Sequence, residues 1–202
     1  MSPVNAAYCC KWGNEWAVAI AWNRPKYLKL HFPERPQTMN KVNVLFCCMA
    51  NICRSPMAEG ALRELVKNAG YTDKIFIDSA GTHAHYLGRP PDPRAQRAML
   101  ERRIDISGLR SRRILLADFQ RFHHILVMDA ENYDALRFIC PRAHIHKIRY
   151  LLDFAPQFKT RDVPDPYHGE EIVFYRVREM IERAAEGVFA YLHESLNDNK
   201  VT

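Results

Sequence analysis

Short apolar runs alternate with stretches of helical period along the chain from residue 40 onward. These runs have the length and composition of strands, and they are VNVLFC (42–47), KIFID (74–78), HHILVM (123–128) and HKIRYL (146–151). Strands that alternate with helices are typical of units in which successive strands lie parallel. The pattern therefore predicts an α/β domain built on a parallel sheet.

Helical spacing of apolar residues fills the intervals between these runs. It predicts a first helix up to residue 69, with Gly70 as its C-cap, and two more over 92–103 and 129–139. A long helix over 170–196 has one broad apolar face, which should lie on the sheet. That face is formed by Ile172, Tyr175, Val177 or Arg178, Ile181, Ala185, Val188 and Leu192.

The first 39 residues differ from the rest of the chain. They contain all three tryptophans and show no regular apolar period. Their apolar run WAVAIAW is too short to span a bilayer, and its Ala-x-Ala pattern falls inside the run, where a signal peptide would not be cut. We predict a poorly ordered N-terminal extension over 1–39, one domain over 40–197 and a C-terminal tail over 198–202. A chain that begins at Met39 should keep both fold and activity.

Composition narrows the class of protein. With 48% apolar and 26% charged residues, the chain has the make-up of a soluble globular domain. The net charge of +6 is spread along the chain, and its densest basic segment, LERRIDISGLRSRRI, is interrupted by acidic and apolar residues. A nucleic-acid site would need a continuous basic patch. We therefore expect neither a nucleic-acid partner nor a membrane, and a monomer or a weak homo-oligomer.

The cysteines and histidines also carry information. Cysteines stand at 9, 10, 47, 48, 53 and 140, and two adjacent pairs make a poor framework for disulfides. This distribution predicts a reducing, cytoplasmic compartment. The nine histidines show no metal-ligand spacing, so we predict no metal and no cofactor.

One segment, CCMANICRSPMAEG (47–60), follows the first strand at the edge where parallel sheets bind ligands. The loop between Cys48 and Arg54 can curl its amides around a tetrahedral oxyanion, and the following helix start favours negative charge. These donors favour the thiolate of Cys48 at neutral pH. Arg54 can hold two oxygens of a phosphoryl group, and the hydroxyl of Ser55 can donate to the sulfur. The segment therefore predicts a nucleophile aimed at phosphorus.

A thiolate that cleaves a phosphate ester needs an acid to protonate the leaving group. Asp165 in VPDPYHG is the best candidate, because prolines on both sides stiffen its loop just before the last long helix. The alternative for this residue is an ordinary turn aspartate before proline.

The motif CMANICRS resembles the C-x5-R-S signature of low-molecular-weight protein tyrosine phosphatases, and PMAEG resembles the family's helix start. The similarity covers about residues 42 to 195 and includes DSAGT (78–82), GRPPDPRA (88–95), MDAENY (128–133) and VPDPYHG (163–169). The resemblance implies a four-stranded parallel sheet flanked by helices on both faces, with a phosphate-binding loop after the first strand. It also implies hydrolysis of phosphotyrosine in proteins through a phosphocysteine, with Cys48 as nucleophile and Asp165 as general acid and then base.

The resemblance extends to supporting residues. The implied phosphate-binding loop comprises Met49, Ala50, Asn51, Ile52 and Cys53, with Ser55 after the arginine. Asn51 should hold the loop in a strained turn through side-chain hydrogen bonds, with Ser79 as one partner. Tyr167 should form a wall of the pocket, with His85 or Tyr86 at the opposite rim. Cys53 is either a redox partner that forms a reversible disulfide with the nucleophile or a plain helix-start residue.

Three positions depart from the family's pattern. Ala50 replaces the usual glycine, and it would strain the loop or lower activity if that position needs a positive φ. Cys47 replaces a common valine, and on a strand it should point away from Cys48 into the core. Arg103 replaces a glycine often found after the second helix, which alters a loop and not the chemistry.

Two other functions compete with the phosphatase. An arsenate reductase of the same fold needs two further downstream cysteines, and only Cys140 follows Cys53. A silent phosphotyrosine-binding module, which Ala50 makes conceivable, would need neither the thiolate nor the acid. The sequence therefore favours the phosphatase.

Overall fold

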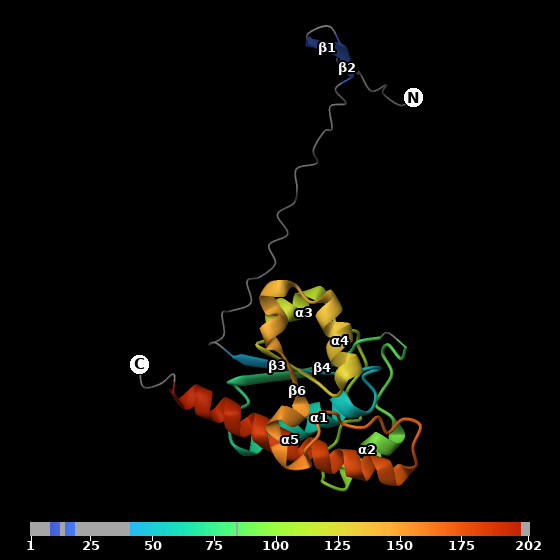
Figure 1. The fold of residues 1–202 in the computed structure, drawn as a ribbon, viewed down its shortest axis with the longest axis vertical. Coiled ribbons are helices and arrows are strands. Elements are labelled where there is room, and N and C mark those ends of the chain that lie inside the picture. The colour runs from blue at the N-terminus through green and yellow to red at the C-terminus, as the bar shows by residue number, and fades with distance from the viewer. Residues whose placement is uncertain (1–8, 13–14, 19–40, 84, 199–202) are drawn as a thin grey trace, which may run out of the picture. The chain divides into compact units, whose positions relative to one another are not determined.

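A computed structural model describes residues 9–12, 15–18, 41–83 and 85–198 (Figure 1). The chain divides into two units, 1–38 and 39–202, and each is described by itself. In the first unit, β1 (Cys9–Trp12) and β2 (Glu15–Val18) pair antiparallel, two strands that the sequence pattern did not predict. Most of the predicted extension and the tail beyond residue 198 lie outside the described residues. The predicted boundaries at 39 and 198, and the order of both segments, therefore stay predictions.

The second unit is built on a four-stranded parallel sheet with the order β4-β3-β5-β6. Its strands are β3 (Val42–Cys48), β4 (Ile75–Gly81), β5 (His124–Val127) and β6 (Ile148–Tyr150). The chain moves from β3 to one side of the sheet and then crosses to the other side. The carboxyl end of β3 is thus the point where strand order reverses, which is where open α/β sheets bind ligands. The predicted fold class is confirmed.

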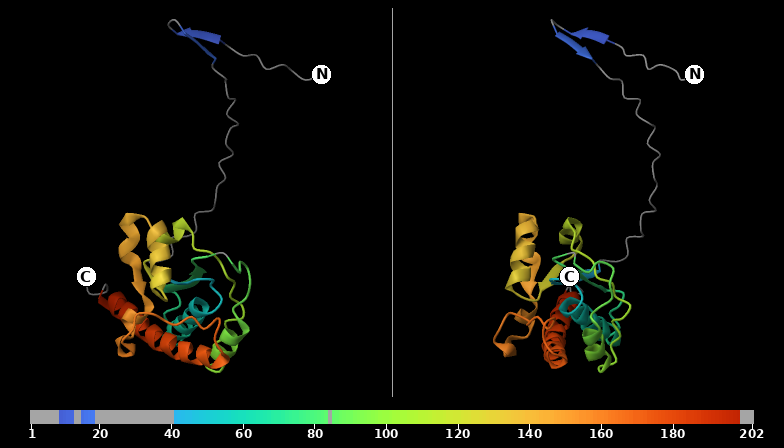
Figure 2. Two further views of the ribbon diagram at one scale, coloured as in Figure 1. Left: turned by 45° about the vertical axis from the view of Figure 1, so that its right-hand side comes forward. Right: turned by 90° about the vertical axis from the view of Figure 1, so that its right-hand side faces the viewer.

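Helices cover both faces of this sheet, as Figures 1 and 2 show. One face carries α1 (Arg54–Asn68), α2 (Pro93–Leu100) and α5 (Glu171–Asp198), and the other carries α3 (Leu116–Arg121) and α4 (Ala130–Ile139). Short 3-10 turns follow at η1 (Arg142–Lys147), η2 (Leu151–Phe154) and η3 (Pro156–Phe158). The sequence missed α3 because six residues are too few for a helical period to stand out.

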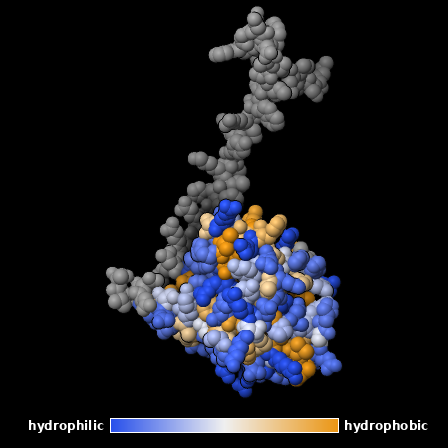
Figure 3. All heavy atoms as spheres, viewed as in Figure 1, coloured by the Kyte–Doolittle hydropathy of each residue, from blue (hydrophilic) through white to orange (hydrophobic). Residues whose placement is uncertain are grey.

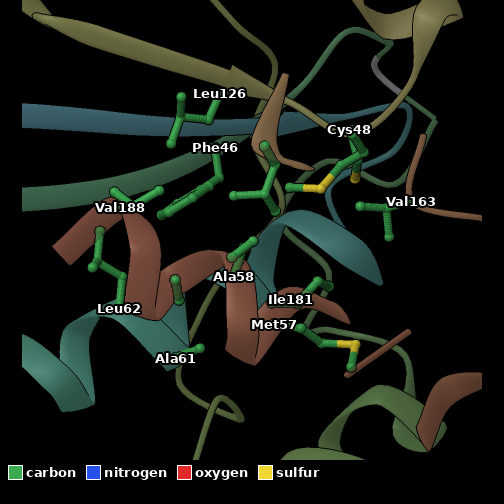
Figure 4. Packing of buried hydrophobic residues seen from close by; sticks show 14 of the residues in the cluster. Phe46, Cys48, Met57, Ala58, Ala61, Leu62, Leu126, Val163, Ile181 and Val188 are labelled. Carbon is green, nitrogen blue, oxygen red and sulfur yellow. The ribbon is translucent and has the colours of Figure 1, made fainter. Parts of the chain in front are cut away.

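The buried residues alternate along β3 between two clusters, one on each side of the sheet. Phe46 and Cys48 belong to the larger cluster under α1 and α5, whereas Cys47 belongs to the smaller one under α3 and α4. Figure 4 shows Phe46 grouped with Leu62 of α1 and Val188 of α5. The predicted placement of Cys47 in the core, on the face away from Cys48, is confirmed.

The predicted apolar face of α5 is wrong at one position, Ile172. Ile172 is 54% exposed, because it lies nine residues before the buried Ile181 and therefore half a turn around the helix. Phe174, seven residues before Ile181, lies on the buried face instead.

The surface of the second unit is mixed. Hydrophilic residues cover most of the face shown in Figure 3, and hydrophobic residues form small separate areas on it. Within the described ranges, no helix is both long and apolar enough to cross a membrane.

Candidate active site

The loop 48–54, named the phosphate loop after its predicted function, joins the end of β3 to the start of α1. Cys48 and Arg54, at its two ends, are 3% and 2% exposed. No side chain caps α1 at Cys53, so its first N–H groups are not taken by a capping side chain. A cavity of about 660 Å³ opens over the loop. Its lining residues are Cys48, Met49, Ala50, Ile52, Cys53, Arg54, His85, Tyr86, Glu131, Asp165, Tyr167 and His168.

The sulfur of Cys48 has a hydrogen-bonding partner behind the loop. Sγ lies 3.0 Å from the hydroxyl oxygen of Ser55. That oxygen already accepts a hydrogen bond from Nδ2 of Asn51 at 2.9 Å, which leaves the hydroxyl hydrogen of Ser55 to donate to the sulfur. Ser55 therefore lies within hydrogen-bonding distance of the sulfur, as its predicted role requires, and that role in the reaction stays a prediction.

Asn51 holds the loop from its buried side. Its backbone has a φ of 56°, and its Nδ2 also donates to the hydroxyl of Ser79 at 2.8 Å. Its Oδ1 accepts from the backbone N–H of Arg112 at 2.9 Å. Asparagine tolerates this left-handed conformation better than most residues. The left-handed residue of the loop is thus Asn51 and not Ala50, so the strain considered for Ala50 does not arise.

The hydrogen bonds continue from Ser79 into α1. The hydroxyl of Ser79 donates to the carboxylate of Glu59, which also pairs with Arg63. Burial raises the pKa of Glu59 above its ordinary value, although Arg63 and Ser79 offset part of this effect. The sequence singled out Ser79 but missed Glu59, which stands in the quoted PMAEG motif.

Arg54 points its guanidinium at the mouth of the loop. Nη1 donates to a carboxylate oxygen of Asp129 and to the carbonyl oxygen of Val163, and Nη2 donates to Asp165 at 2.7 Å. Burial lowers the pKa of Arg54, but the neighbouring Cys48, Asp165 and Asp129 together raise it by more, so the net shift of the pKa is upward. The side chain is therefore a fixed cation that neighbouring anions hold in place.

Asp129 is a site residue that the sequence analysis did not single out. Its second carboxylate oxygen accepts from the backbone N–H of Asn132 at 2.7 Å and caps α4. The available signal was the quoted motif MDAENY, in which an aspartate follows a buried strand directly.

Asp165 reaches the same cavity from the segment 163–169, named the acid loop. Its side chain is 42% exposed, and its Oδ1 accepts from the backbone N–H of Tyr167 at 3.1 Å. The backbone of Val163 donates to Met128 at 2.7 Å and so anchors the start of this loop beside β5. Asp165 can therefore face a group bound over Cys48 and exchange protons with solvent.

Two tyrosines line the cavity and contact each other. The hydroxyls of Tyr86 and Tyr167 are hydrogen-bonded at 2.7 Å, and the ring centroids are 6.1 Å apart. His85 also lines the cavity, so both residues that the sequence left open, His85 and Tyr86, line it. His168 and Glu131 were missed. His168 directly follows Tyr167, whereas Glu131 gave no signal beyond its place after a strand.

The remaining cysteines differ in surroundings. Cys53 lines the cavity with Cys48, and burial first and Cys48 second raise its pKa well above the ordinary value. Cys140 lies in the smaller cluster on the other side of the sheet. All four cysteines in the described part of the second unit are free. Among the described residues, no group of three or more acidic, histidine or cysteine side chains is placed to bind a metal.

Known proteins resemble this chain over most of the second unit. A family model for low molecular weight phosphotyrosine protein phosphatase matches residues 43–200. The low molecular weight protein-tyrosine-phosphatase YfkJ of Bacillus subtilis is 35% identical over 76% of this chain and 97% of its own length. The human low molecular weight phosphotyrosine protein phosphatase is 35% identical, over 75% and 96%. A crystal structure of a protein tyrosine phosphatase from Entamoeba histolytica has a TM-score of 0.74 at 37% identity and covers 77% of this chain and 99% of its own. The chain belongs to the low molecular weight phosphotyrosine protein phosphatase family, a family of hydrolases.

Proposed function

We propose that the protein hydrolyses phosphotyrosine in proteins through a phosphocysteine formed on Cys48. The observation that carries this proposal is that a candidate nucleophile, a fixed cation and a candidate acid, Cys48, Arg54 and Asp165, line one cavity at the carboxyl end of β3. Family membership supports the reaction class, and the residue roles are inferred from geometry.

Binding places the phosphoryl group in the phosphate loop. The backbone N–H groups at the start of α1 and the guanidinium of Arg54 supply donors for its oxygens. Arg54 holds Asp165 through Nη2 before substrate arrives. The incoming dianion takes over that donor, which releases Asp165 toward the leaving group.

In the first step, the thiolate of Cys48 attacks phosphorus. The sulfur–phosphorus bond forms as the bond to the tyrosyl oxygen breaks, and Asp165 in its protonated form gives its proton to that oxygen. In the second step, Asp165 takes a proton from water while the water oxygen attacks phosphorus. The sulfur leaves as a thiolate that the hydroxyl of Ser55 stabilises, and inorganic phosphate is released.

The walls of the cavity favour an aryl ester. A phosphate at the bottom of the loop would put its aromatic ring between Tyr86 and Tyr167, whose hydroxyl–hydroxyl bond must open to admit it. Apolar ring contacts on both sides stabilise a tyrosyl ring more than a seryl methylene. The substrate class is therefore a phosphotyrosine side chain on a protein. The predicted reversible disulfide between Cys48 and Cys53, the cytoplasmic location and the monomeric or weakly oligomeric state stay predictions within this proposal.

The competing functions fit the site less well. A relay of disulfides needs cysteines that reach Cys48, but Cys140 is buried in the cluster on the opposite face of the sheet. A silent binding module was conceivable because of Ala50, but that residue does not carry the positive φ of the loop.

Hydrolysis of a phosphotyrosyl peptide by the wild type and three variants tests the proposal. Cys48→Ser should abolish turnover, and Asp165→Ala should lower kcat/KM by about 10²–10⁴-fold, the usual contribution of a general acid. Cys140→Ser is the matched control and should stay active. Wild-type protein that binds the peptide without turnover would support the module, and arsenate-dependent consumption of thiol would support the reductase.

A further inference from the structure

The motif GRPPDPRA (88–95) takes no part in the chemistry proposed above, yet it contacts both loops of the site. Asp92 is the N-cap of α2 and accepts from the backbone N–H of Arg94 at 2.8 Å. The backbone N–H of Asp92 donates to the carbonyl oxygen of Ile52 at 2.8 Å. The start of α2 is therefore tied directly to the phosphate loop.

The guanidinium of Arg94 joins this anchor to the acid loop. Nε and Nη2 bind the two carboxylate oxygens of Asp92 at 3.0 and 2.9 Å. On its other side, Nη1 donates to the carbonyl oxygen of Gly169 at 3.0 Å and Nη2 to that of Tyr167 at 2.9 Å. Its Cζ atom lies 4.5 Å from the ring centre of Phe174 in α5. A planar fork with several fixed donors can make these bonds together, and an ammonium group cannot.

The two ends of the acid loop are held by different residues. The start is fixed through Val163, which bonds to Met128 and Arg54. At the end, the backbone N–H of Gly169 bonds within the loop, to Pro166 at 2.9 Å. The carbonyl bonds that tie this end to α2 are the two made by Arg94. Asp165 lies between the two anchors, so its position depends on both.

We propose that Arg94 is a positioning residue for Asp165, which couples the acid loop to the phosphate loop through Asp92. This inference rests on the proposed function. Arg94 does not line the cavity, so it acts through the loop that carries Asp165 and not on the substrate. Loss of the guanidinium frees two carbonyl groups of the acid loop, and the carboxyl group no longer meets the leaving oxygen at a fixed distance. A misplacement of about 1 Å can cost about 10²-fold in rate.

The dependence of kcat/KM on the leaving group separates positioning of the acid from other effects. Phenyl phosphate has a basic leaving group that must be protonated, whereas 2,4-dinitrophenyl phosphate loses an anion that needs no proton. The ratio kcat/KM covers the steps up to cleavage of the ester bond and excludes hydrolysis of the phosphocysteine. Asp165→Ala defines the full effect, a large loss on phenyl phosphate and a small one on the dinitrophenyl ester.

Arg94→Ala should lower kcat/KM for phenyl phosphate by about 10-fold or more and leave that for the dinitrophenyl ester within about threefold. Arg94→Lys should give an intermediate loss on phenyl phosphate. In the double variant Arg94→Ala/Asp165→Ala, the loss should equal that of Asp165→Ala alone, because the positioned group is absent. Arg97→Ala is the matched control: it lies one turn along α2 and removes an exposed ion pair with Glu171, so both esters should react as in wild type.

Equal losses on both esters, or additive losses in the double variant, would overturn the inference and assign Arg94 to folding or phosphate binding. If Arg94→Ala does not fold, as judged by thermal unfolding, Arg94→Lys decides by the same two ratios. Absence of a leaving-group effect in Asp165→Ala would instead contradict the proposed function, so the two failures are distinguishable.

Discussion

The phosphate loop is held by two polar networks that differ in chemistry and in exposure. The back network, behind the loop, consists of Asn51, Ser55, Ser79 and Glu59. The front network, at the mouth, consists of Arg54, Asp129 and Asp165. Every member of the back network is at most 4% exposed, whereas Asp129 and Asp165 are 18% and 42% exposed. The first is made mainly of amide and hydroxyl groups, and the second of charges.

This difference implies that the two networks have different roles. When a buried hydrogen bond is broken, the donor or acceptor that remains finds no water to replace the lost partner, which costs about 1–3 kcal/mol for each unsatisfied group. The back network therefore fixes the shape of the loop whether or not substrate is bound. The front network must change when a phosphoryl group arrives, because Arg54 already donates to Asp165. Changes behind the loop should reduce stability and rate together, and changes in front should alter rate and anion affinity with little effect on folding.

Asn51→Ala should give the largest combined loss of stability and rate. It removes three hydrogen bonds and puts alanine at a φ of 56°, so we expect a loss of about 2–4 kcal/mol in the free energy of unfolding. We expect kcat/KM for an aryl phosphate to fall by about 10²-fold as the loop loses its shape. Denaturant unfolding and steady-state kinetics measure the two quantities.

Asn51→Gly is the matched control for this change, since glycine keeps the left-handed backbone without the side chain. It should be about 1 kcal/mol more stable than Asn51→Ala and nearly as slow. Wild-type activity in the glycine variant would mean that only the backbone angle matters and that the back network is dispensable.

Asp129→Asn tests the front network. The amide oxygen can still cap α4, but the negative charge beside Arg54 is lost. One charge fewer near a bound dianion should lower KM and the inhibition constant of inorganic phosphate. The rate constant kcat should fall by about 10-fold because the guanidinium is less well oriented. A rise in KM at unchanged kcat, or a loss of stability as large as that of Asn51→Ala, would contradict the division between the networks.

The sequence predicted the parts of the site that one segment encodes. The motif placed Cys48, Arg54 and Ser55 at a strand-to-helix junction, and the proline-flanked loop supplied Asp165. The sequence alone does not reveal which residues the topology brings to the loop from distant segments. Asp129 is an ordinary carboxylate in sequence, and only the parallel packing of β3 with β5 sets it beside the loop. Glu59 stands in the same segment as the loop, but its bond to the loop's network runs through Ser79, which the packing of β3 with β4 brings to it.

The two departures from the family's glycines show the same limit. The sequence raised the possibility of strain at Ala50, but the loop takes its left-handed angle one residue later, at Asn51. The other departure, Arg103, does have a positive φ, of 61°. A departure from the family's pattern shows where a glycine has been replaced. Only the backbone φ at that position shows whether the fold needs a glycine there.

Arg103→Gly provides a left-handed residue outside both networks. After α2, the N–H of residue 103 donates to the carbonyl of residue 100, and that of 104 to the carbonyl of 99. The same two hydrogen bonds follow α1, from the N–H of 70 to the carbonyl of 67 and from 71 to 66. Gly70 occupies the left-handed position in α1, at a φ of 74°, and exposed Arg103 occupies it in α2. Replacement by glycine should therefore stabilise the protein by about 0.5–1 kcal/mol without a change in kcat. Thermal unfolding measures this gain, and Gly70→Ala, the reverse change in the same motif, should destabilise; a loss of stability in Arg103→Gly would contradict the assignment.

Glu59→Gln should give the smallest effect, because glutamine can still accept from Ser79 and the back network keeps its shape. The remaining difference lies in the pH dependence. Burial raises the folded-state pKa of Glu59 above its ordinary 4.5, so the folded state binds more protons than the unfolded state just above that pH. This contribution to stability is complete below pH 4.5 and is lost as the pH rises through the folded-state pKa. The free energy of unfolding of wild type should therefore fall relative to that of Glu59→Gln as the pH rises above 4.5, while kcat at neutral pH changes far less than in Asn51→Ala. A pH series of denaturant unfolding curves measures this slope, and an opposite slope would mean that the pairing with Arg63 outweighs burial.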